Sequence, residues 1–463
     1  MIRQILCLKI QPVIDLIHFH GGIVYLVGGA VRDYKMNRTP KDLDFVVRGF
    51  QIENLVSILD TMGETNLVGA SFSVIKFKYQ GTEYDFALPR IEKSTGNGHT
   101  DFDVIAEPFI SIESDLARRD FAMNAMAVNM RTGEWIDPFD GQWDCETHLL
   151  SMVNTRTFIE DPLRMMRAIQ FASRFDLELS TETIENLETQ YMLIETVSKE
   201  RIAIEFCKML QSNRPSIGIN LMMKFGLLEY VMPELSRLQY LKQPSKYHAY
   251  DVYEHSVRAC DAIPIGANKS KTVQLRLAAL LHDVGKFDTQ SFNRNGEVSF
   301  HGHDEVGAKI ASTILSRLKF SSVPGLDINH DAIVDLIENH MFDCDCESTP
   351  KAMRKFIAKI GQPSMFDQIR LRIGDRLAKG ILVDVQEWVT FAKKLRLTHH
   401  GKKTAFGLCD LAINGNDVQR LLSIGPSSLV GVILKNLLER CIENPEMNTV
   451  ENLTQILLKI DEG

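Results

Sequence analysis

The sequence predicts an α+β protein of several domains, with a mixed sheet and helices near the N-terminus and helical regions behind it. Strand-like runs alternate with turns from about Ile23 to Ile136. After Asp137 the apolar residues recur with helical period almost to the end. A chain of 463 residues with 44% hydrophobic residues also exceeds what one hydrophobic core usually organises.

Shifts of pattern along the chain predict four regions. They are a mixed α/β head over residues 1–150, a helical neck over 151–243, a helical metal-binding domain over 244–380 and a C-terminal helical region over 381–463. The stretch KQPSKYHAY and the change of pattern after Gly380 mark two of the joints. Within the head, EKSTGNGHTDFDVIAEP is rich in Gly, Ser and Thr, which predicts a mobile loop.

The first residues, MIRQILCLKIQPVIDLIHFHGG, contain Arg3, Lys9 and Asp15 among the apolar positions. They therefore offer neither a signal core nor the roughly 20 apolar residues of a membrane span. We expect a short amphipathic helix on the head and no membrane association.

Charge and cysteine content give weaker indications. The net charge is −8 and the pI about 5.9, so an RNA partner would be held by a local basic face. The eight cysteines lack the spacing of a disulfide scaffold, which favours reduced thiols in the cytoplasm. Cys344 and Cys346 have no second ligand pair at finger spacing, so core or surface thiols are favoured over a metal site.

The stretch YLVGGAVRDYKMNRTPKDLDFVV indicates a site for a nucleotide and a metal. Asp42 and Asp44 are two apart in a strand-like run, so both side chains are expected on one face. Two such carboxylates repel unless a hard divalent cation lies between them. Gly28 and Gly29 let backbone N–H groups approach an anion, and Arg32 adds a guanidinium suited to phosphate. The alternative is a solvated turn.

Asp85, in YDFALPR, lies on a later predicted strand. We expect it to bring a third carboxylate to the same site. The alternative is an ordinary charge on an edge strand.

Five motifs in order carry a family resemblance. With GGAVRD, DLD, RRDFAMNAMAV, DPFDGQWD and EDPLRMMRAIQFASRF, the chain from about Ile23 to Phe206 resembles the class II tRNA nucleotidyltransferase and bacterial poly(A) polymerase superfamily. The resemblance implies a nucleotidyltransferase head of the polymerase beta type. The chain departs from the pattern in two places: YKMNRTP lacks a frequent glycine, and Gln170 stands where an arginine is frequent.

The resemblance implies roles for individual residues. Asp42, Asp44 and Asp85 would be catalytic, the first two by holding Mg²⁺ for in-line transfer to an RNA 3′-hydroxyl. The implied nucleotide-binding residues are Gly28, Gly29, Arg32, Arg119, Asp120, Asn124, Asp161, Arg164 and Arg167. Asp120 and Asn124 are spaced to share one face of a helix.

Asp161 and Arg164 bear on substrate choice. If a helix extends to both, they project to one side as an acceptor and a donor able to read the edge of a base. The resemblance implies a protein template that selects CTP and ATP, with Arg167 assisting. The alternative is helix capping by Asp161 ahead of Pro162.

A second constellation lies in the helical part. Six ligand-type residues occur in order: His255, His282, Asp283, His303, His340 and Asp375. Imidazole and carboxylate groups suit Mn, Fe, Co, Ni or Zn, which support phosphoester hydrolysis. Residues 247–380 resemble the HD phosphohydrolase domain, which implies His255, His282, Asp283 and Asp375 as core ligands and His303 and His340 as ligands of a second metal. Lys286 is placed to touch a substrate phosphate or to be an ordinary helix-end lysine.

The segment from Leu411 resembles the C-terminal helical region of several nucleotidyltransferases, so we expect it to contact the tRNA elbow or a second subunit. Together these features predict template-independent addition or repair of the 3′ CCA of tRNA from CTP and ATP, releasing pyrophosphate, with phosphohydrolase activity of the HD domain possible. Three alternatives stay open: poly(A) polymerase, a partial enzyme adding only CC or A, and an HD hydrolase with an RNA-binding head. The acidic ending KIDEG disfavours poly(A) polymerase, which usually carries a basic tail.

Overall fold

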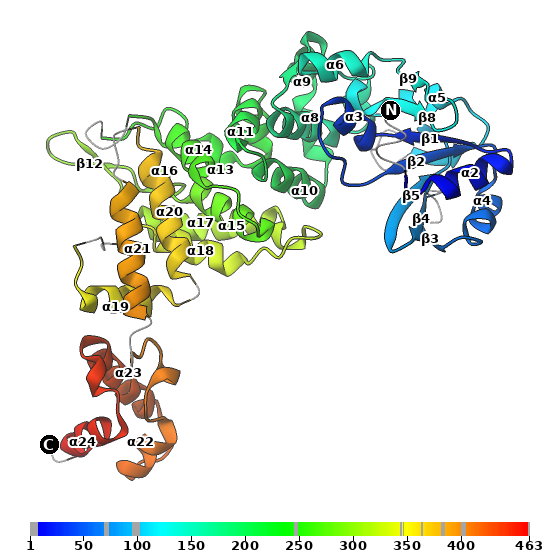
Figure 1. Ribbon diagram of the computed structural model, residues 1–463. Coiled ribbons are helices and arrows are strands. Elements are labelled where there is room, and N and C mark those ends of the chain that lie inside the picture. Colours follow the sequence, from blue (N-terminus) through cyan, green and yellow to red (C-terminus); the bar gives the residue numbers. More distant parts are fainter. Residues whose placement is uncertain are drawn as a thin grey trace. The chain divides into compact units, whose positions relative to one another are not determined.

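The computed structural model describes residues 8–68, 74–94, 102–244, 249–342, 345, 347–362, 364–380, 385–399 and 404–461 (Figure 1). Side chains are not described at 91–94, 102–106, 385, 460 and 461. The CDCE pair, Cys344 and Cys346, lies outside the described residues. Residue contacts divide the chain into two units, Met1–Val231 and Met232–Gly463. The four predicted regions are a finer division and stay a prediction.

A seven-stranded sheet organises the first unit, in the order β3-β4-β5-β2-β1-β8-β9 (Figure 1). The strands are β1 (Ile23–Val27), β2 (Asp44–Arg48), β3 (Glu64–Val68), β4 (Val74–Tyr79), β5 (Thr82–Ala87), β8 (Ala127–Asn129) and β9 (Trp135–Ile136). Only β2 and β5 run parallel as neighbours, and the other pairs are antiparallel. The predicted mixed sheet is confirmed.

Apolar side chains of the strands build the core of the head. Tyr25, Val27 and Val46 pack with Ile112 and Leu116 in one buried cluster, which joins the sheet to helix α5 (Ile112–Ala117). The predicted N-terminal helix is present as α2 (Gln11–Phe19), whose buried residues give it one apolar face.

Helices make up most of the rest of the first unit. They are α3 (Gly29–Lys35), α4 (Ile52–Leu59), α6 (Gly141–Thr147), α7 (Thr157–Glu160), α8 (Leu163–Phe175), α9 (Thr181–Gln190), α10 (Lys199–Leu210), α11 (Pro215–Lys224) and α12 (Leu227–Val231), with 3₁₀ turns η1 (Ala122–Asn124) and η2 (Tyr191–Thr196). Helix α8 is buried along most of its length and packs against α10 and α11. One departure from the all-helix prediction is the parallel pair β10 (Leu149–Leu150) and β11 (Glu178–Leu179).

The predicted mobile loop is partly wrong. Strands β6 (Arg90–Ser94) and β7 (Phe102–Ala106) pair antiparallel within it, while residues 95–101 are not described. The β-branched residues Val104 and Ile105 suit a strand, and each strand pairs its backbone with the other along one side. A prediction from polar composition alone therefore extends the loop over residues that form strands.

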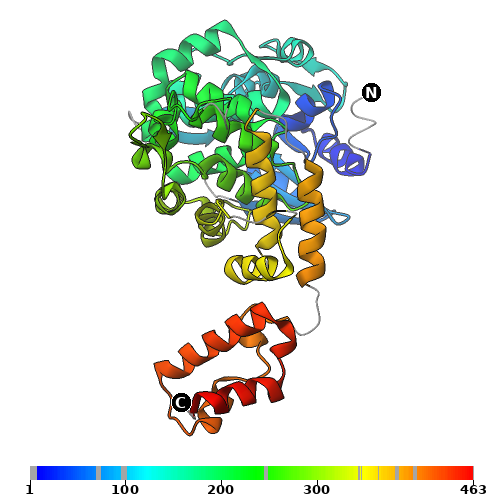
Figure 2. The same ribbon diagram turned by 90° about the vertical axis from the view of Figure 1, so that its left-hand side faces the viewer.

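In the part of the second unit that the structure describes, the only strands are those of the short hairpin of β12 (Ser291–Phe292) and β13 (Val298–Ser299), and the other elements are helices. Its helices are α13 (Pro233–Ser236), α14 (Val252–Ala262), α15 (Lys269–Leu281), α16 (Lys286–Thr289), α17 (His303–Arg317), α18 (His330–Glu338), α19 (Pro350–Ile360), α20 (Met365–Leu377), α21 (Val385–His399), α22 (Gly415–Leu421), α23 (Ser428–Glu443) and α24 (Val450–Asp461), with 3₁₀ turns η3 (Phe320–Ser322), η4 (Leu408–Asp410) and η5 (Pro445–Met447). Figure 2 shows α22 to α24 packed together in orange and red, around a core that includes Leu437 and Leu453. None of the helices in the described ranges has the length and apolarity needed to cross a bilayer.

A buried carboxylate in the head predicts a measurable pH dependence of stability. Asp144 on α6 accepts hydrogen bonds from the Ser151 backbone N–H at 2.8 Å and from its hydroxyl at 2.9 Å. Burial nevertheless raises the pKa of Asp144 from 3.8 to about 6. The folded chain thus holds this proton more tightly than the unfolded chain, so the contribution of Asp144 to stability is lost as pH rises from about 4 through 6.

The Asp144→Asn variant lacks this titration. Between pH 4 and pH 7 the free energy of unfolding of the natural protein should fall by about 2 kcal/mol relative to that of Asp144→Asn. Urea unfolding at both pH values measures the difference. Parallel pH dependences of the two proteins would show that Asp144 is ionised throughout.

Candidate active site

Two carboxylates face each other in the middle of the sheet. Asp44 opens β2, and the parallel register places it directly opposite Asp85 on β5. Burial raises the pKa of Asp44, and the charges of Asp85 and Asp42 raise it further, against the opposing effect of Arg119. Asp42 thus acts on the site electrostatically. It lies before β2 and not within it, so the predicted alternation of Asp42 and Asp44 along one strand is wrong.

The glycine pair brings the backbone close to these carboxylates. Gly28 has φ +68°, and a Cβ there would lie 3.2 Å from Arg119 Nη1 and 3.7 Å from Asp44 Oδ2. A larger residue would therefore be strained and crowded at this point. Gly29 begins α3, whose next turn carries the buried Arg32.

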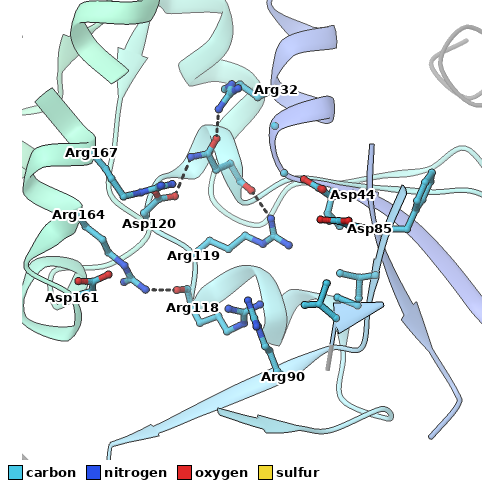
Figure 3. Close-up of a pocket in the computed structure, with 18 of the residues that line it drawn as sticks. Arg32, Asp44, Asp85, Arg90, Arg118, Arg119, Asp120, Asp161, Arg164 and Arg167 are labelled. Carbon is cyan, nitrogen blue, oxygen red and sulfur yellow. Dashed lines mark hydrogen bonds and ion pairs between the residues drawn. The ribbon is translucent and has the colours of Figure 1, made fainter. Parts of the chain in front are cut away.

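A cavity of about 510 Å³ opens over Asp44 and Asp85 (Figure 3). Among the described residues, four aspartates and seven arginines line it; the arginines are Arg32, Arg90, Arg118, Arg119, Arg164, Arg167 and Arg201. The excess of guanidinium groups suits a polyanion such as a triphosphate. Gly28 and Gly29 line the same cavity, whereas Asp42 is not one of its described lining residues.

The sequence analysis did not predict three of these arginines, Arg90, Arg118 and Arg201. One buried carboxylate holds Arg118 together with its predicted neighbour Arg119. Asp115 on α5 is fully buried. It pairs with Arg118 at 2.8 Å and with Arg119 at 3.2 Å. Although burial opposes ionisation, these two arginines hold the pKa of Asp115 below its usual range. The spacing of Asp115 three and four residues before the arginine doublet was the available sequence signal.

A chain of polar contacts crosses one wall of the cavity (Figure 3). Arg32 Nη1 donates to Asn124 Oδ1 at 2.8 Å, Asn124 Nδ2 donates to Asp120 Oδ1 at 3.0 Å, and Arg167 Nε donates to Asp120 Oδ2 at 2.7 Å. Burial opposes ionisation of Asp120, but Arg167 and Asn124 hold its pKa below the usual range. The predicted pairing of Asp120 and Asn124 is present. Its predicted basis is wrong, because Asn124 belongs to η1 and Asp120 precedes that turn.

Asp161 and Arg164 both line the cavity, but neither is free of protein partners. Asp161 lies between α7 and α8, outside the helix that begins at Leu163. Its carboxylate accepts from the Leu163 backbone N–H at 3.1 Å and pairs with Arg201 at 2.8 Å. Arg164 donates to the Arg118 carbonyl oxygen at 2.8 Å. The capping alternative is thus partly realised, and the same contacts fix both side chains at the cavity wall.

The second constellation forms one buried cluster in the second unit. Asp283 joins two groups of potential ligands: His255 and His282 on one side, His303 and His340 on the other. Its Oδ2 lies 3.2 Å from His282 Nε2, and its Oδ1 lies 3.3 Å from His303 Nε2.

Two further groups complete the surroundings of this cluster. Asp375 Oδ1 lies 3.2 Å from His255 Nε2, so all six predicted ligands are brought together. The buried Lys286 places its ammonium 2.7 Å from Asp283 Oδ2. This contact is not that of an exposed helix-end lysine.

Backbone carbonyls orient the imidazoles. The Nδ1 atoms of His282, His303 and His340 lie 2.7 to 2.8 Å from the carbonyl oxygens of Ala279, Phe300 and Ile337. Since a carbonyl only accepts, each Nδ1 carries a proton, and the Nε2 atom of each ring faces the cluster. Burial and the charge of His282 lower the pKa of His340 to about 3, which keeps its ring neutral.

The donor sets of both sites fit divalent cations. Carboxylate oxygens alone at Asp44 and Asp85 suit a hard ion that also binds phosphate oxygens. Buried imidazole nitrogens with a shared carboxylate suit a borderline transition metal. The two sites therefore have different metal preferences by chemistry.

Comparison with known proteins finds three matching family models along the chain. Residues 24–151 match the poly(A) polymerase head domain, residues 176–238 match a probable RNA- and SrmB-binding site of polymerase A, and residues 246–380 match the HD domain. The multifunctional CCA protein of Nitrosococcus oceani is 36% identical over 300 residues, which are 64% of this chain and 70% of that protein. The chain belongs to the multifunctional CCA protein family.

Other comparisons extend this assignment. The multifunctional CCA protein of Neisseria meningitidis is 33% identical over 297 residues, 64% of this chain and 68% of that protein. The fold is that of the CCA-adding enzymes: the Bacillus stearothermophilus enzyme in complex with CTP has TM-score 0.73 at 20% identity, covering 99% of this chain and 98% of that one. The Thermotoga maritima enzyme complexed with tRNA has TM-score 0.58 at 19% identity, covering 97% and 94%.

Membership in the multifunctional CCA protein family confirms the resemblance that the five motifs indicate. It also confirms the HD domain behind the head. Nucleotidyltransferase heads and HD domains use divalent metals, in agreement with the two donor sets.

Proposed function

We propose that this protein adds or repairs the 3′-terminal CCA of tRNA, using CTP and ATP and releasing pyrophosphate. The register of Asp44 opposite Asp85, under a cavity lined by seven arginines among the described residues, carries this proposal. Relatives named multifunctional CCA proteins and folds solved with CTP, ATP and tRNA support it. The proposed place of action is the cytoplasm.

In this proposal the carboxylates at the site bind the metal. Asp42, Asp44 and Asp85 provide negative charge for Mg²⁺, which when bound assists attack by the RNA 3′-hydroxyl and departure of pyrophosphate. The parallel register of β2 and β5 places Asp44 and Asp85 side by side, and both line the cavity. Asp42 contributes through its field on Asp44.

The basic residues bind the triphosphate and the ribose. Gly28 and Gly29 give access to the backbone, and Arg32 and Arg119 supply charge beside them. Asp120 and Asn124 hold Arg32 and Arg167 in place, so these guanidinium groups need no reorganisation when the nucleotide binds.

Asp161 and Arg164 select the base in this proposal, because their side chains are fixed at the cavity wall as an acceptor and a donor. Replacing Arg164 by alanine should reduce the preference for CTP and ATP over UTP and GTP by about tenfold or more, since a base-reading pair is worth roughly 1–3 kcal/mol. Competition between labelled nucleotides measures this ratio. Arg164→Lys keeps the charge without the planar fork and should lose nearly as much selectivity. Unchanged selectivity with a lower rate would leave Arg164 a purely structural role.

Sequencing the 3′ ends of a tRNA transcript that lacks CCA, after incubation with all four nucleotides, tests the proposal. We expect CCA and no longer tails. Adenosine tails of variable length would indicate a poly(A) polymerase, and ends at CC would indicate a partial enzyme.

We propose phosphoester hydrolysis as a second activity, located at the HD cluster. The observation that favours it is the bridging position of Asp283 between two imidazole pairs, which suits two transition-metal ions among Mn, Fe, Co, Ni and Zn. The buried ammonium of Lys286 is placed to bind a phosphate oxygen beside them. Hydrolysis of bis-p-nitrophenyl phosphate by the Ni²⁺- or Mn²⁺-loaded protein tests it, and no metal-dependent release of nitrophenol would contradict it.

A further inference from the structure

Three arginines gather on one aromatic ring at the end of α8. The guanidinium carbons of Arg32, Arg38 and Arg174 lie 4.5, 4.7 and 5.0 Å from the centroid of the Phe175 ring. Phe175 itself is buried, so it is a fixed support for the three groups. Arg32 and Arg38 come from α3 and the turn after it, whereas Arg174 and Phe175 end α8 (Figure 1).

The charge of this cluster is not balanced. Arg32 pairs with Asp33 at 2.6 Å. Throughout the described ranges, no carboxylate lies within ion-pair distance of Arg38 or Arg174. The oxygen of the Gln170 amide, in the orientation that satisfies both groups, accepts from Arg174 Nη1 at 3.1 Å. Gln170 is neutral, so it orients Arg174 without cancelling its charge.

The cost of this arrangement points to an anion. Burial lowers the pKa of Arg174, and the charges of Arg32 and Arg38 act in the same direction. Asp33 and Glu205 oppose this effect through their charges, but Asp33 pairs with Arg32 and the buried Glu205 pairs with Lys208, so neither forms an ion pair with Arg38 or Arg174. A phosphate group would relieve this repulsion and match the planar donors.

The position of the cluster indicates which phosphate. Arg32 connects the cluster to the nucleotide cavity, because it lines that cavity and also lies over the Phe175 ring. Arg38 is exposed and Arg174 is half-buried, so the outer members are open to a ligand from solvent. In the proposed function the 3′ end of an RNA enters this cavity, so the phosphates that precede the 3′ end have to pass near the residues around it.

We propose that Arg38 and Arg174, supported by Phe175, form a phosphate subsite beside the nucleotide cavity that binds a backbone phosphate of the RNA substrate. This inference rests on the proposed function for its choice of RNA. The same donors would suit the pyrophosphate product, so the experiment distinguishes the two sources.

The test measures binding of a tRNA transcript ending in CC to the full chain, without nucleotide, at several salt concentrations. The double variant Arg38→Gln/Arg174→Gln should weaken binding about five- to tenfold and make the slope of log K against log salt shallower by about 0.7 to 0.9, as for the loss of one phosphate contact. Arg38→Lys/Arg174→Lys keeps both charges and should restore the slope. Arg131→Gln, which removes an exposed arginine of the β8–β9 turn in the same unit, should stay within about twofold of the natural protein.

Several results would overturn the subsite. Unchanged affinity and slope in the double variant would do so, as would an equal effect of Arg131→Gln. Unchanged RNA binding with weaker inhibition of transfer by pyrophosphate would assign the cluster to the product instead. If the natural protein binds tRNA, the double variant weakens that binding, and yet no nucleotide is added by either, the proposed function is wrong and the subsite stands.

Discussion

Replacing Asp44 by asparagine is expected to reduce nucleotidyl transfer by about a thousandfold or more while the head stays folded. The variant keeps the size of the side chain and removes its charge. Asp44 faces Asp85 in register, and divalent cations that assist in-line transfer need this pair of charges. Single-turnover addition of CMP to a tRNA lacking CCA, in saturating Mg²⁺, measures the loss.

Two comparisons make this result specific. Asp60→Asn alters an exposed carboxylate at the end of α4 and should leave the rate within about twofold. Asp42→Ala should also abolish transfer without unfolding the head, and retained incorporation of CMP and AMP would refute a catalytic role of Asp42. Circular dichroism of Asp44→Asn should match that of the natural protein. Burial disfavours the charged form of Asp44, so a neutral amide in its place should not destabilise the fold. Retained CMP and AMP incorporation in Asp44→Asn would remove this carboxylate from the mechanism.

Replacing Asp283 by asparagine is expected to abolish metal binding at the HD cluster altogether. One carboxylate oxygen faces His282 and the other faces His303, so a single substitution affects both groups of ligands. The substitution removes the shared anionic ligand from both groups at once and leaves Asp375 as the remaining carboxylate beside the imidazoles, a loss that typically costs several kcal/mol of binding free energy. Metal content after loading with Ni²⁺ or Mn²⁺ and dialysis should fall to near zero, and hydrolysis of bis-p-nitrophenyl phosphate should be lost with it.

His303→Asn is the matched variant, because it removes a ligand from one group only. It should retain the metal bound by His255, His282 and Asp375. Nucleotidyl transfer should be unaffected in both variants, since Asp44 and Asp85 belong to the first unit. Full metal content in Asp283→Asn would contradict the bridging position.

The candidate sites were predictable where a local pattern determines the geometry. The position of Asp85 on a later predicted strand led us to expect it near Asp44, although the parallel pairing of β2 and β5 was not predicted. The order of histidines and aspartates, with its resemblance to the HD domain, led us to expect the HD cluster. The arginines of the cavity were harder, because Arg90 and Arg201 come from β6 and α10 and no spacing relates them.

Local errors had physical causes as well. Periodicity alone could not show that the strand begins at Asp44 and leaves Asp42 before it. The hairpin of β6 and β7 depends on pairing between two segments that each look irregular. The contacts of Asp161 with Leu163 and Arg201 combine a local cap with a distant ion pair, and only the cap is visible in sequence.

The most direct test of CCA addition is extension of three tRNA transcripts that end before CCA, after C and after CC. Labelled CTP, ATP and UTP are supplied with Mg²⁺, and products are read at single-nucleotide resolution. Growth that stops at CCA on all three transcripts is the predicted result. Extension of the CC-ended transcript alone, unlimited addition of adenosine, or no transfer at all would contradict it.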